Sequence, residues 1–361
     1  MKILSFSHYS VKMIGGHRPY NIDKALLKKG VEMTQINNWA MFSFRPSGRK
    51  VFASEQRERE KIFDTFVESG KKDAYIMLHG PFFPEKFMKK LVKTGIPTIM
   101  DFRDDPILQS EMLGVDINKK NAMANIKAAF EYSELILFPS ETLKNYYPEI
   151  SEKAVTIMNA GDPDHFRFSP LPNNHHVVSL MTSAPCYMYD TLLEACIQAR
   201  KNITDLQIHL RYLPEKNVGD FMQFSNEIRK KYNFDWVHYF ESIPYDQIFN
   251  FLSQFQLNAI SVKKGKYSDS GLPLKLFDSM AMGRPVVITN CTEMGKIVRE
   301  TDCGLTFEFT AEDLSEKIQK VLDNPNLAQK MGENGRKAIE TKHSWDHRAD
   351  EILMAISKIL S

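Results

Sequence analysis

Hydrophobic residues in this chain form short runs that alternate with longer amphipathic stretches. Glycine, proline or polar residues end most of the runs, which predicts buried strands. Apolar positions three and four apart in the longer stretches predict helices. The predicted strands cover residues 3–6, 31–36, 74–78, 97–100, 135–138, 155–158, 177–181, 206–210, 237–240, 257–262, 285–289 and 305–307. The predicted helices cover residues 18–29, 84–94, 189–199, 245–254, 274–282, 311–322, 327–342 and 346–360.

A polar, proline-rich segment at residues 169–176 interrupts this alternation and is typical of a linker. A chain of 361 residues is too long for one ordinary hydrophobic core. We therefore expect an α/β protein with Rossmann-like domains at residues 1–168 and 177–342, followed by a helix within 343–361. Ligands of parallel sheets bind beyond the carboxyl ends of the strands, so a cleft between the two halves is expected.

Composition narrows the class of protein. The chain is 43% hydrophobic and 25% charged with a net charge of +2, which favours a globular protein and gives no sign of nucleic-acid binding. The four cysteines stand apart and predict free thiols, and no apolar run approaches the roughly 18 residues of a membrane helix. A cytoplasmic location is expected. Paired lysines such as Lys28/Lys29 and Lys89/Lys90 allow a peripheral membrane contact, but solvated helix faces are the favoured explanation.

The segment from residue 268 to 287 carries the clearest chemistry. A loop containing Gly271 and Pro273 leads into a predicted helix, whose first free N–H groups can hold a diphosphate. Lys275 would add positive charge, and Asp278 lies three residues further on, on the same helix face. A carboxylate there can accept both hydroxyl groups of a ribose. The alternative is an ordinary Lys–Asp pair on a helix surface.

This segment resembles the donor-site motif of retaining glycosyltransferases of the GT-B fold, family 4. The matching residues read Leu-Pro-Leu-Lys-Leu-Phe-Asp-Ser-Met-Ala-Met-Gly-Arg-Pro-Val at positions 272–286. Further stretches resemble the same family in its order along the chain. They are Gly15-Gly16, Phe138-Pro139-Ser140-Glu141, Asn159-Ala160-Gly161-Asp162, Phe240 to Tyr245, and Met331 to Arg336 with Ser344-Trp345. The resemblance implies two Rossmann-like domains whose parallel sheets face across a cleft, with the last helix crossing back to the first domain.

The resemblance also implies roles for individual residues. Gly15 and Gly16 would let the first domain approach the donor phosphates. The donor loop at Ser270, Gly271, Leu274 and Lys275 would hold the diphosphate, and Asp278 would bind the ribose. The backbone around Ile243 would meet the base. The implied donor is a nucleoside diphosphate sugar, UDP-linked rather than GDP-linked, and no cofactor or metal is expected.

Two departures from the family pattern concern charge. The family has two glutamates eight residues apart, where this chain has Ser270 and Asp278. The family also carries an arginine and a lysine just after the first strand of the second domain, where residues 182–189 contain neither. A departing diphosphate needs positive charge. We hypothesise that Lys263, Lys264 or Lys266 supplies it, and a solvated lysine loop is the alternative.

Candidates for the acceptor side follow the strands of the first half. Asp101 and Arg103 come directly after a predicted strand and resemble a family segment that contacts the acceptor or the transferred sugar. His79 ends a neighbouring strand, where a base can act. The alternatives are a loop ion pair with a helix cap and a buried structural histidine.

The sequence thus predicts a retaining hexosyltransferase that acts on a glycan, a lipid-linked sugar or a small hydroxylated acceptor in glycoconjugate synthesis. Two other functions stay open. One is a catalytically silent nucleotide-binding subunit, suggested by Ser270 and the altered loop at residues 182–189. The other is a nucleotide-sugar epimerase on the same scaffold.

Overall fold

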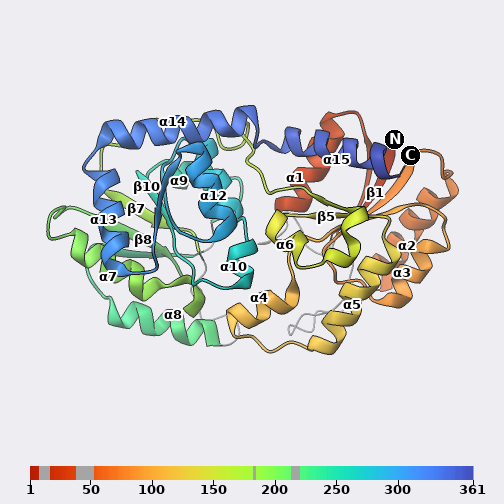
Figure 1. The fold of residues 1–361 in the computed structure, drawn as a ribbon, viewed down its shortest axis with the longest axis horizontal. Coiled ribbons are helices and arrows are strands. Elements are labelled where there is room, and N and C mark those ends of the chain that lie inside the picture. The colour runs from red at the N-terminus through yellow and green to blue at the C-terminus, as the bar shows by residue number, and fades with distance from the viewer. Residues whose placement is uncertain (8–16, 38–52, 182–183, 213–219, 242, 361) are drawn as a thin grey trace. The chain divides into compact units, whose positions relative to one another are not determined.

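The computed structural model describes residues 1–7, 17–37, 53–181, 184–212, 220–241 and 243–360 (Figure 1). The chain divides into two compact units. The first unit contains Met1–Met158 and Trp345–Ser361, and the second contains Asn159–Ser344. Each unit has one six-stranded sheet in which every pair of neighbouring strands is parallel.

The sheet of the first unit has the strand order β2-β1-β3-β4-β5-β6. Its strands are β1 (Lys2–Ser7), β2 (Glu32–Asn37), β3 (Ala74–His79), β4 (Thr98–Asp101), β5 (Leu135–Phe138) and β6 (Ala154–Thr156). The helices are α1 (His17–Lys28), α2 (Ala53–Glu68), α3 (Glu85–Val92), α4 (Pro106–Leu113), α5 (Lys119–Tyr132), α6 (Glu141–Asn145) and α15 (Trp345–Ile359). The central strands are buried along nearly their whole length, as expected of a parallel sheet covered on both faces.

The sheet of the second unit has the strand order β12-β11-β10-β7-β8-β9. Its strands are β7 (His176–Ser179), β8 (Gln207–Arg211), β9 (Val237–Phe240), β10 (Leu257–Ile260), β11 (Val286–Thr289) and β12 (Gly304–Phe307). The helices are α7 (Tyr189–Ala199), α8 (Asp220–Lys231), α9 (Ile248–Leu252), α10 (Lys266–Ser270), α11 (Leu274–Met282), α12 (Thr292–Thr301), α13 (Ala311–Leu322) and α14 (Pro325–Thr341).

The last helix, α15, belongs to the first unit although it follows the whole of the second unit in sequence. It packs beside α1, where Lys28 pairs with Asp346 at 3.0 Å and Lys29 pairs with Asp350 at 2.7 Å. Residues 159–168 lie in the second unit, so the division falls before the proline-rich segment rather than within it. Arg284 explains why that segment is held there, because its guanidinium donates to the carbonyls of Ser169 and Pro170 at 2.6 and 3.1 Å.

All twelve predicted strands are present, which confirms the predicted α/β class. The prediction of α11 over residues 274–282 is also confirmed to the residue. Two local predictions differ from the structure. The helix predicted over residues 245–254 is shorter, with α9 covering Ile248–Leu252. Residues 266–270, read as part of a loop, form the short helix α10.

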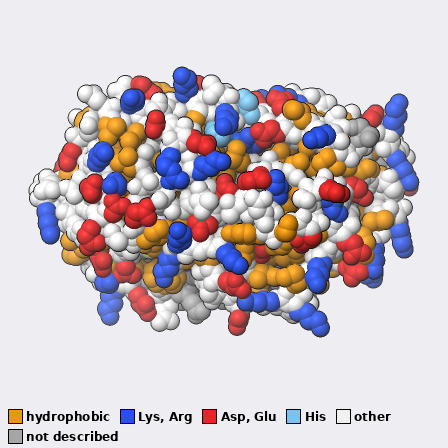
Figure 2. All heavy atoms as spheres, in the orientation of Figure 1, with side chains coloured by type: hydrophobic (Ala, Val, Ile, Leu, Met, Phe, Trp, Pro, Cys, Tyr) orange, Lys and Arg blue, Asp and Glu red, His pale blue; other side chains and the backbone are white. Residues whose placement is uncertain are grey.

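The surface shows no patch dominated by one sign of charge on the face drawn in Figure 2, where acidic and basic side chains are interspersed. Within the described ranges, no helix is both long and apolar enough to cross a membrane. The same ranges contain no cluster of three or more histidine, cysteine, aspartate or glutamate side chains arranged to hold a metal ion.

Candidate functional site

Helix α11 carries the predicted donor-site residues, and local sequence sets its limits. Pro273 precedes the helix in an extended conformation with φ −67° and ψ 136°. Its ring has no hydrogen-bond acceptor, so the first helical N–H groups have no side-chain cap. Gly283 ends it in the left-handed conformation with φ +73°, which glycine adopts most easily. Leu276 and Phe277 are fully buried. Ser279 accepts a hydrogen bond from Asn258 of β10 at 2.7 Å, which fixes the helix against the sheet.

Lys275 and Asp278 lie three residues apart on α11, and both remain partly exposed. The pKa of Lys275 is lowered to about 8, mainly by burial and then by the Arg211 charge, against the opposing effect of Asp278. The pKa of Asp278 is raised to about 8, mainly by burial, with Lys275 opposing the shift and Asp162 adding to it. Both groups therefore sit where charge is poorly solvated, as in many functional sites.

Arg211 is a member of this cluster that the sequence analysis missed. It is the last residue of β8 and is 7% exposed. Burial lowers the pKa of its guanidinium. Asp101 became a candidate because it is a charged residue at the end of a buried strand, and Arg211 fits the same pattern. The site thus brings together Arg211, the α11 residues Lys275 and Asp278, and Asp162, which come from three separate parts of the sequence.

The segment at residues 159–162 holds the loop in front of α11. Asn159 donates a hydrogen bond from its side-chain amide to the carbonyl of Leu272 at 2.5 Å. A side chain at Gly161 would place its Cβ 3.0 Å from the carbonyl oxygen of Phe277, so only glycine fits this approach easily. Asp162 accepts from the backbone N–H groups of Asp164 and His165, both at 3.1 Å. Two of the sequence motifs therefore form one local structure.

The other residues predicted to hold the diphosphate differ in their surroundings. Gly271 follows α10 in an extended conformation, and Leu274 begins α11 and is partly exposed. Ser270 is 3% exposed, and its hydroxyl donates to the carbonyl of Tyr267 at 3.0 Å. The Ser270 side chain thus makes a contact inside α10.

The remaining predicted donor-site residues lie at the surface or outside the described ranges. Lys263 and Lys264 are exposed, and the Lys264 ammonium lies 5.9 Å from the ring centre of Phe309. Ile243 is partly exposed. Gly15 and Gly16 lie outside the described residues, so their predicted role in phosphate binding stays a prediction.

Helix α14 supports α11 through two glycines of the C-terminal motif. A Cβ on Gly332 would lie 2.1 Å from the carbonyl oxygen of Gly283, and one on Gly335 would lie 3.2 Å from the Cα of Met280. The two helices approach so closely that side chains at these positions would push them apart. Arg336 completes the contact by donating to the carbonyl of Ala281 at 2.8 Å. The motif therefore positions the helix that carries Lys275 and Asp278.

In the first unit, His79 and Asp101 are neighbours in register at the ends of β3 and β4. His79 Nδ1 lies 2.9 Å from Asp101 Oδ2. Arg18 of α1 approaches the same carboxylate, with Nε and a terminal nitrogen at 3.0 and 2.8 Å from Oδ1. Asp23 is 3.6 Å from His79 Nε2. The four side chains form a network with almost no exposed surface.

In this network the carboxylates of Asp101 and Asp23 face the positive charges of Arg18 and His79. Burial opposes ionisation of Asp101, but Arg18 and His79 outweigh it and hold the Asp101 pKa well below its usual range. Burial likewise disfavours the charged imidazole, yet hydrogen bonds and charge from Asp101 and Asp23 raise the pKa of His79. Asp101 is therefore a buried carboxylate paired with cations, which is an arrangement that holds the strand ends in place. The reacting roles predicted for His79 and Asp101 remain proposals.

The residues after Asp101 have structural contacts. Arg103 is 9% exposed, and its Nε lies 3.8 Å from a carboxylate oxygen of Asp104. Asp105 caps α4 by accepting from the backbone N–H groups of Ile107 and Leu108 at 2.8 and 3.0 Å. Tyr147 donates its hydroxyl hydrogen to the other oxygen of Asp105. The predicted ion pair and helix cap are thus both present in this segment.

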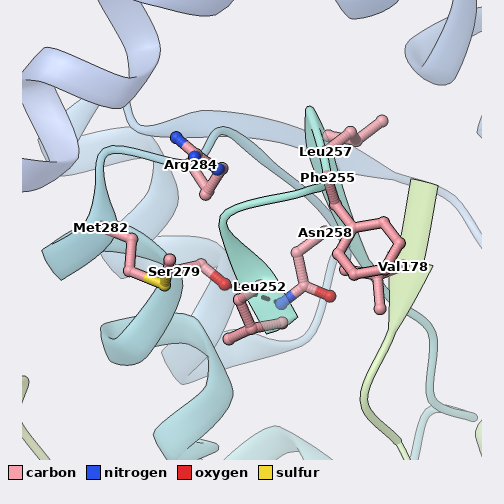
Figure 3. Close-up of a pocket in the computed structure, with 8 residues that line it drawn as sticks. All are labelled: Val178, Leu252, Phe255, Leu257, Asn258, Ser279, Met282 and Arg284. Carbon is pink, nitrogen blue, oxygen red and sulfur yellow. Dashed lines mark hydrogen bonds between the residues drawn. The ribbon is translucent and has the colours of Figure 1, made fainter. Parts of the chain in front are cut away.

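A small internal cavity of the second unit lies beneath α11 (Figure 3). Its volume of about 10 Å³ has room for a single water molecule. Its lining is mainly apolar, with Asn258 and Arg284 as the larger polar groups. A nucleotide sugar cannot fit there, and neither Lys275 nor Asp278 lines this cavity.

Comparisons with known proteins agree with this architecture. Residues 201–354 match a family described as glycosyl transferase-like, a match over less than half of the chain. An uncharacterized glycosyltransferase from Methanocaldococcus jannaschii is 25% identical over 308 residues, which cover 83% of this chain and 78% of that protein. Among solved structures, sucrose-phosphate synthase from Thermosynechococcus elongatus superposes with a TM-score of 0.70 at 14% identity, over 100% of this chain and 99% of that one. Anabaena HepE in complex with UDP and glucose gives a TM-score of 0.72 at 13% identity, over 99% and 100% of the two chains. The protein therefore has the GT-B fold, and the sequence matches support a glycosyltransferase.

Proposed function

We propose that this protein is a retaining glycosyltransferase that uses a nucleoside diphosphate sugar, with UDP as the nucleotide. The observation that carries the proposal is the cluster at the start of α11, where Lys275 and Asp278 lie together on a helix whose first N–H groups have no side-chain cap. The family match includes this helix, and a solved structure of the same fold contains UDP and glucose.

The chemistry of the cluster suits such a donor. The N–H groups at the start of α11 and the Lys275 ammonium attract the diphosphate, and they stabilise the charge that develops as it leaves. Asp278 accepts hydrogen bonds from the ribose hydroxyls. A bound diphosphate favours the charged form of Lys275, whose pKa burial lowers. We assign the donor to the second unit and the acceptor hydroxyl, from a glycan, a lipid-linked sugar or a small molecule, to the first.

The first experiment is thermal-shift binding with UDP, GDP, ADP and their sugar conjugates, comparing wild type with Asp278→Ala. A ligand at 100 times its dissociation constant stabilises the folded protein by about 2.7 kcal/mol. Stabilisation of wild type but not of the variant by a uracil nucleotide supports the proposal. If no nucleotide shifts the wild-type melting temperature at millimolar concentration, the donor site is refuted. Transfer assays with the matching sugar, read by the anomeric proton coupling of the product, then test retention.

A catalytically silent nucleotide-binding protein is the second candidate, and Ser270 favours it. The hydroxyl of this residue is used inside α10, at the position where the resemblance implies a carboxylate that touches the transferred sugar. A silent protein would bind UDP and UDP-sugar with equal affinity and would transfer to no acceptor. An epimerase would instead convert the donor sugar without any acceptor, which nuclear magnetic resonance of the donor alone would detect.

A further inference from the structure

The proposed donor site needs more positive charge than α11 itself provides. A diphosphate carries at least two negative charges, and Lys275 is the single basic side chain of that helix. Residues 182–189, which follow β7 in the sequence, contain no lysine or arginine. Lys263, Lys264 and Lys266 are all exposed, where water and salt weaken their pull on an anion. A second cation must therefore come from elsewhere if the site binds a diphosphate tightly.

The register of the sheet shows which face α11 covers. Asn258 of β10 pairs with Val178 of β7, and Val178 pairs with His209 of β8. Partners in register point to the same face of a parallel sheet. Ser279 of α11 bonds the Asn258 side chain at this level, as Figure 3 shows. The side chain of His209 therefore points to the face that α11 covers.

Relative to His209 and Ser279, Arg211 and Lys275 both lie nearer the carboxyl end of the sheet. Arg211 follows His209 by two residues, so it points to the same face roughly 6.6 Å nearer the carboxyl end of the sheet. Because α11 connects two parallel strands, it runs against them, and its first residues lie at that same end. Lys275 precedes Ser279 by one turn, or about 5.4 Å, and its carbonyl accepts from the Ser279 hydroxyl. Both cations therefore lie at the carboxyl end of the sheet, on the face that α11 covers.

The electrostatics agree with this placement. Burial is the main cause of the low pKa of Lys275, and the positive charge of Arg211 is the next. Arg211 itself is 7% exposed, so water screens the repulsion only weakly. Two cations held together in a poorly solvated place are costly unless an anion joins them. Asp278 acts on Lys275, and Asp162 acts on Asp278.

We propose that Arg211 is the second cation of the diphosphate site, and that its guanidinium and the Lys275 ammonium together bind the two phosphates of the donor. This inference rests on the proposed function and names the residue that takes the place of the basic side chains missing from residues 182–189. The planar guanidinium forms paired hydrogen bonds with phosphate oxygens, which suits it to this role. Arg211 is a binding residue that favours the departure of the diphosphate.

The test compares the affinities of UDP and uridine for wild type, Arg211→Gln and Arg211→Lys by isothermal titration calorimetry. Uridine lacks phosphates, so the ratio of the two affinities isolates the diphosphate contribution. Charged hydrogen bonds are worth about 1.5–3 kcal/mol, so Arg211→Gln should reduce this ratio about 10- to 100-fold while the uridine affinity stays unchanged. Arg211→Lys should reduce the ratio of UDP affinity to uridine affinity less than Arg211→Gln does. Arg284→Gln is the matched control, because Arg284 is also buried and its guanidinium donates to backbone carbonyls.

The outcomes separate this inference from the proposed function. If wild type binds UDP and the ratio is the same in Arg211→Gln, the assignment of Arg211 is wrong and the donor site stands. If wild type binds neither UDP nor inorganic pyrophosphate, both proposals fail. If Arg211→Gln does not fold, Arg211→Lys decides, since an unchanged ratio in that variant overturns the paired hydrogen bonds. Loss of uridine affinity in step with UDP affinity would also overturn the inference, because it indicates a purely structural role.

Discussion

The side chain of Asn159 donates a hydrogen bond to the carbonyl of Leu272 at 2.5 Å, across 113 residues of sequence. Leu272 lies in the short loop between α10 and α11, and its side chain is 4% exposed. Asn159 is the first residue of the second unit. This bond fixes the loop that leads into the Lys275 and Asp278 helix, so it links a residue far from the motif to the geometry of the motif.

Substitution of Asn159 by alanine should therefore loosen the loop. A buried carbonyl that loses its partner costs about 1–3 kcal/mol, and we expect the second unit to lose stability in that range. The affinity for UDP should fall several-fold because the loop is no longer held in its binding conformation. Urea unfolding and calorimetry measure the two effects. Asn174→Ala is the control, since Asn174 makes the same kind of bond to the Gln254 carbonyl at 3.1 Å in an exposed place. Equal effects of the two variants on UDP affinity would contradict the prediction.

Asp278→Asn should stabilise the empty protein while abolishing tight nucleotide binding. The carboxyl group has a pKa near 3.9 when unfolded and about 8 in the fold. The folded protein thus holds a proton that the unfolded chain releases, and the contribution of this group to stability is lost as pH rises from about 4 towards 8. The variant should gain stability over wild type across that window. Melting temperatures measured between pH 5 and pH 8 provide the check, and a constant difference would disprove the raised pKa.

Three histidines on neighbouring strands should make the second unit sensitive to acid. The rings of His176 and His209 lie 5.5 Å apart, and those of His209 and His238 lie 4.5 Å apart. Burial lowers the pKa of His209 to about 4, with smaller effects from His238 and His176. In the unfolded chain His209 takes up a proton as pH falls below about 6.5, whereas in the folded protein it stays neutral down to about pH 4. The free energy of unfolding therefore decreases as pH drops from about 6.5 to about 4.

His209→Phe should remove most of this acid sensitivity, because the new ring can pack on Phe255 as the imidazole does. In wild type the free energy of unfolding should fall by at most about 1.4 kcal/mol per pH unit, because one proton is involved. Urea unfolding of both proteins at pH 7 and pH 5 measures the difference. His175→Gln serves as control, because His175 contacts Asp205 in a solvent-exposed place, with Nδ1 2.7 Å from the carboxylate. Parallel pH dependence in wild type and His209→Phe would count against the prediction.

Asp101→Ala should destabilise the first unit strongly. It leaves Arg18 and His79 buried without their shared carboxylate, and breaking a buried pair in this way costs about 3–5 kcal/mol. The folded-state pKa of Asp101 is depressed, so its contribution is present above pH 4 or so and is lost as pH falls further. Urea unfolding of wild type and variant at neutral pH measures the cost. UDP affinity should change little, because the donor residues belong to the second unit. A variant that is fully stable but inactive would instead indicate a direct role in the reaction.

Gly332→Ala should reduce both stability and nucleotide affinity. The added methyl group would lie 2.1 Å from the Gly283 carbonyl oxygen, so α14 must move away from the end of α11. Such overpacking costs about 1–3 kcal/mol, more than the roughly 1 kcal/mol that alanine gains in a helix. Gly265→Ala is the control, because a Cβ at Gly265 meets no atom within 4 Å. Thermal melting and UDP titration test the pair of variants, and a Gly332→Ala protein as stable as wild type would refute the close packing.

Local patterns in the sequence predicted the strands and the chemistry of α11. The alternation of apolar runs and amphipathic stretches predicted twelve strands, all of which are present. Proline before the helix and glycine after it gave the bounds of α11, and a spacing of three placed Lys275 and Asp278 on one face. These features depend on neighbours within about one or two helical turns, so the local sequence pattern is enough to predict them.

Distant contacts were decided by the tertiary structure. Arg18 and Asp101 are separated by 83 residues, and they meet because the Arg18 side chain of α1 reaches the end of β4. Arg211 and Lys275 lie at the same end of the second sheet because β8 ends there and α11 begins there. Nothing in the local pattern around either residue specifies strand order or which face a helix covers. The sequence therefore determined which residues carry charge and where the elements lie, whereas strand order and helix packing decided which of those charges share a site.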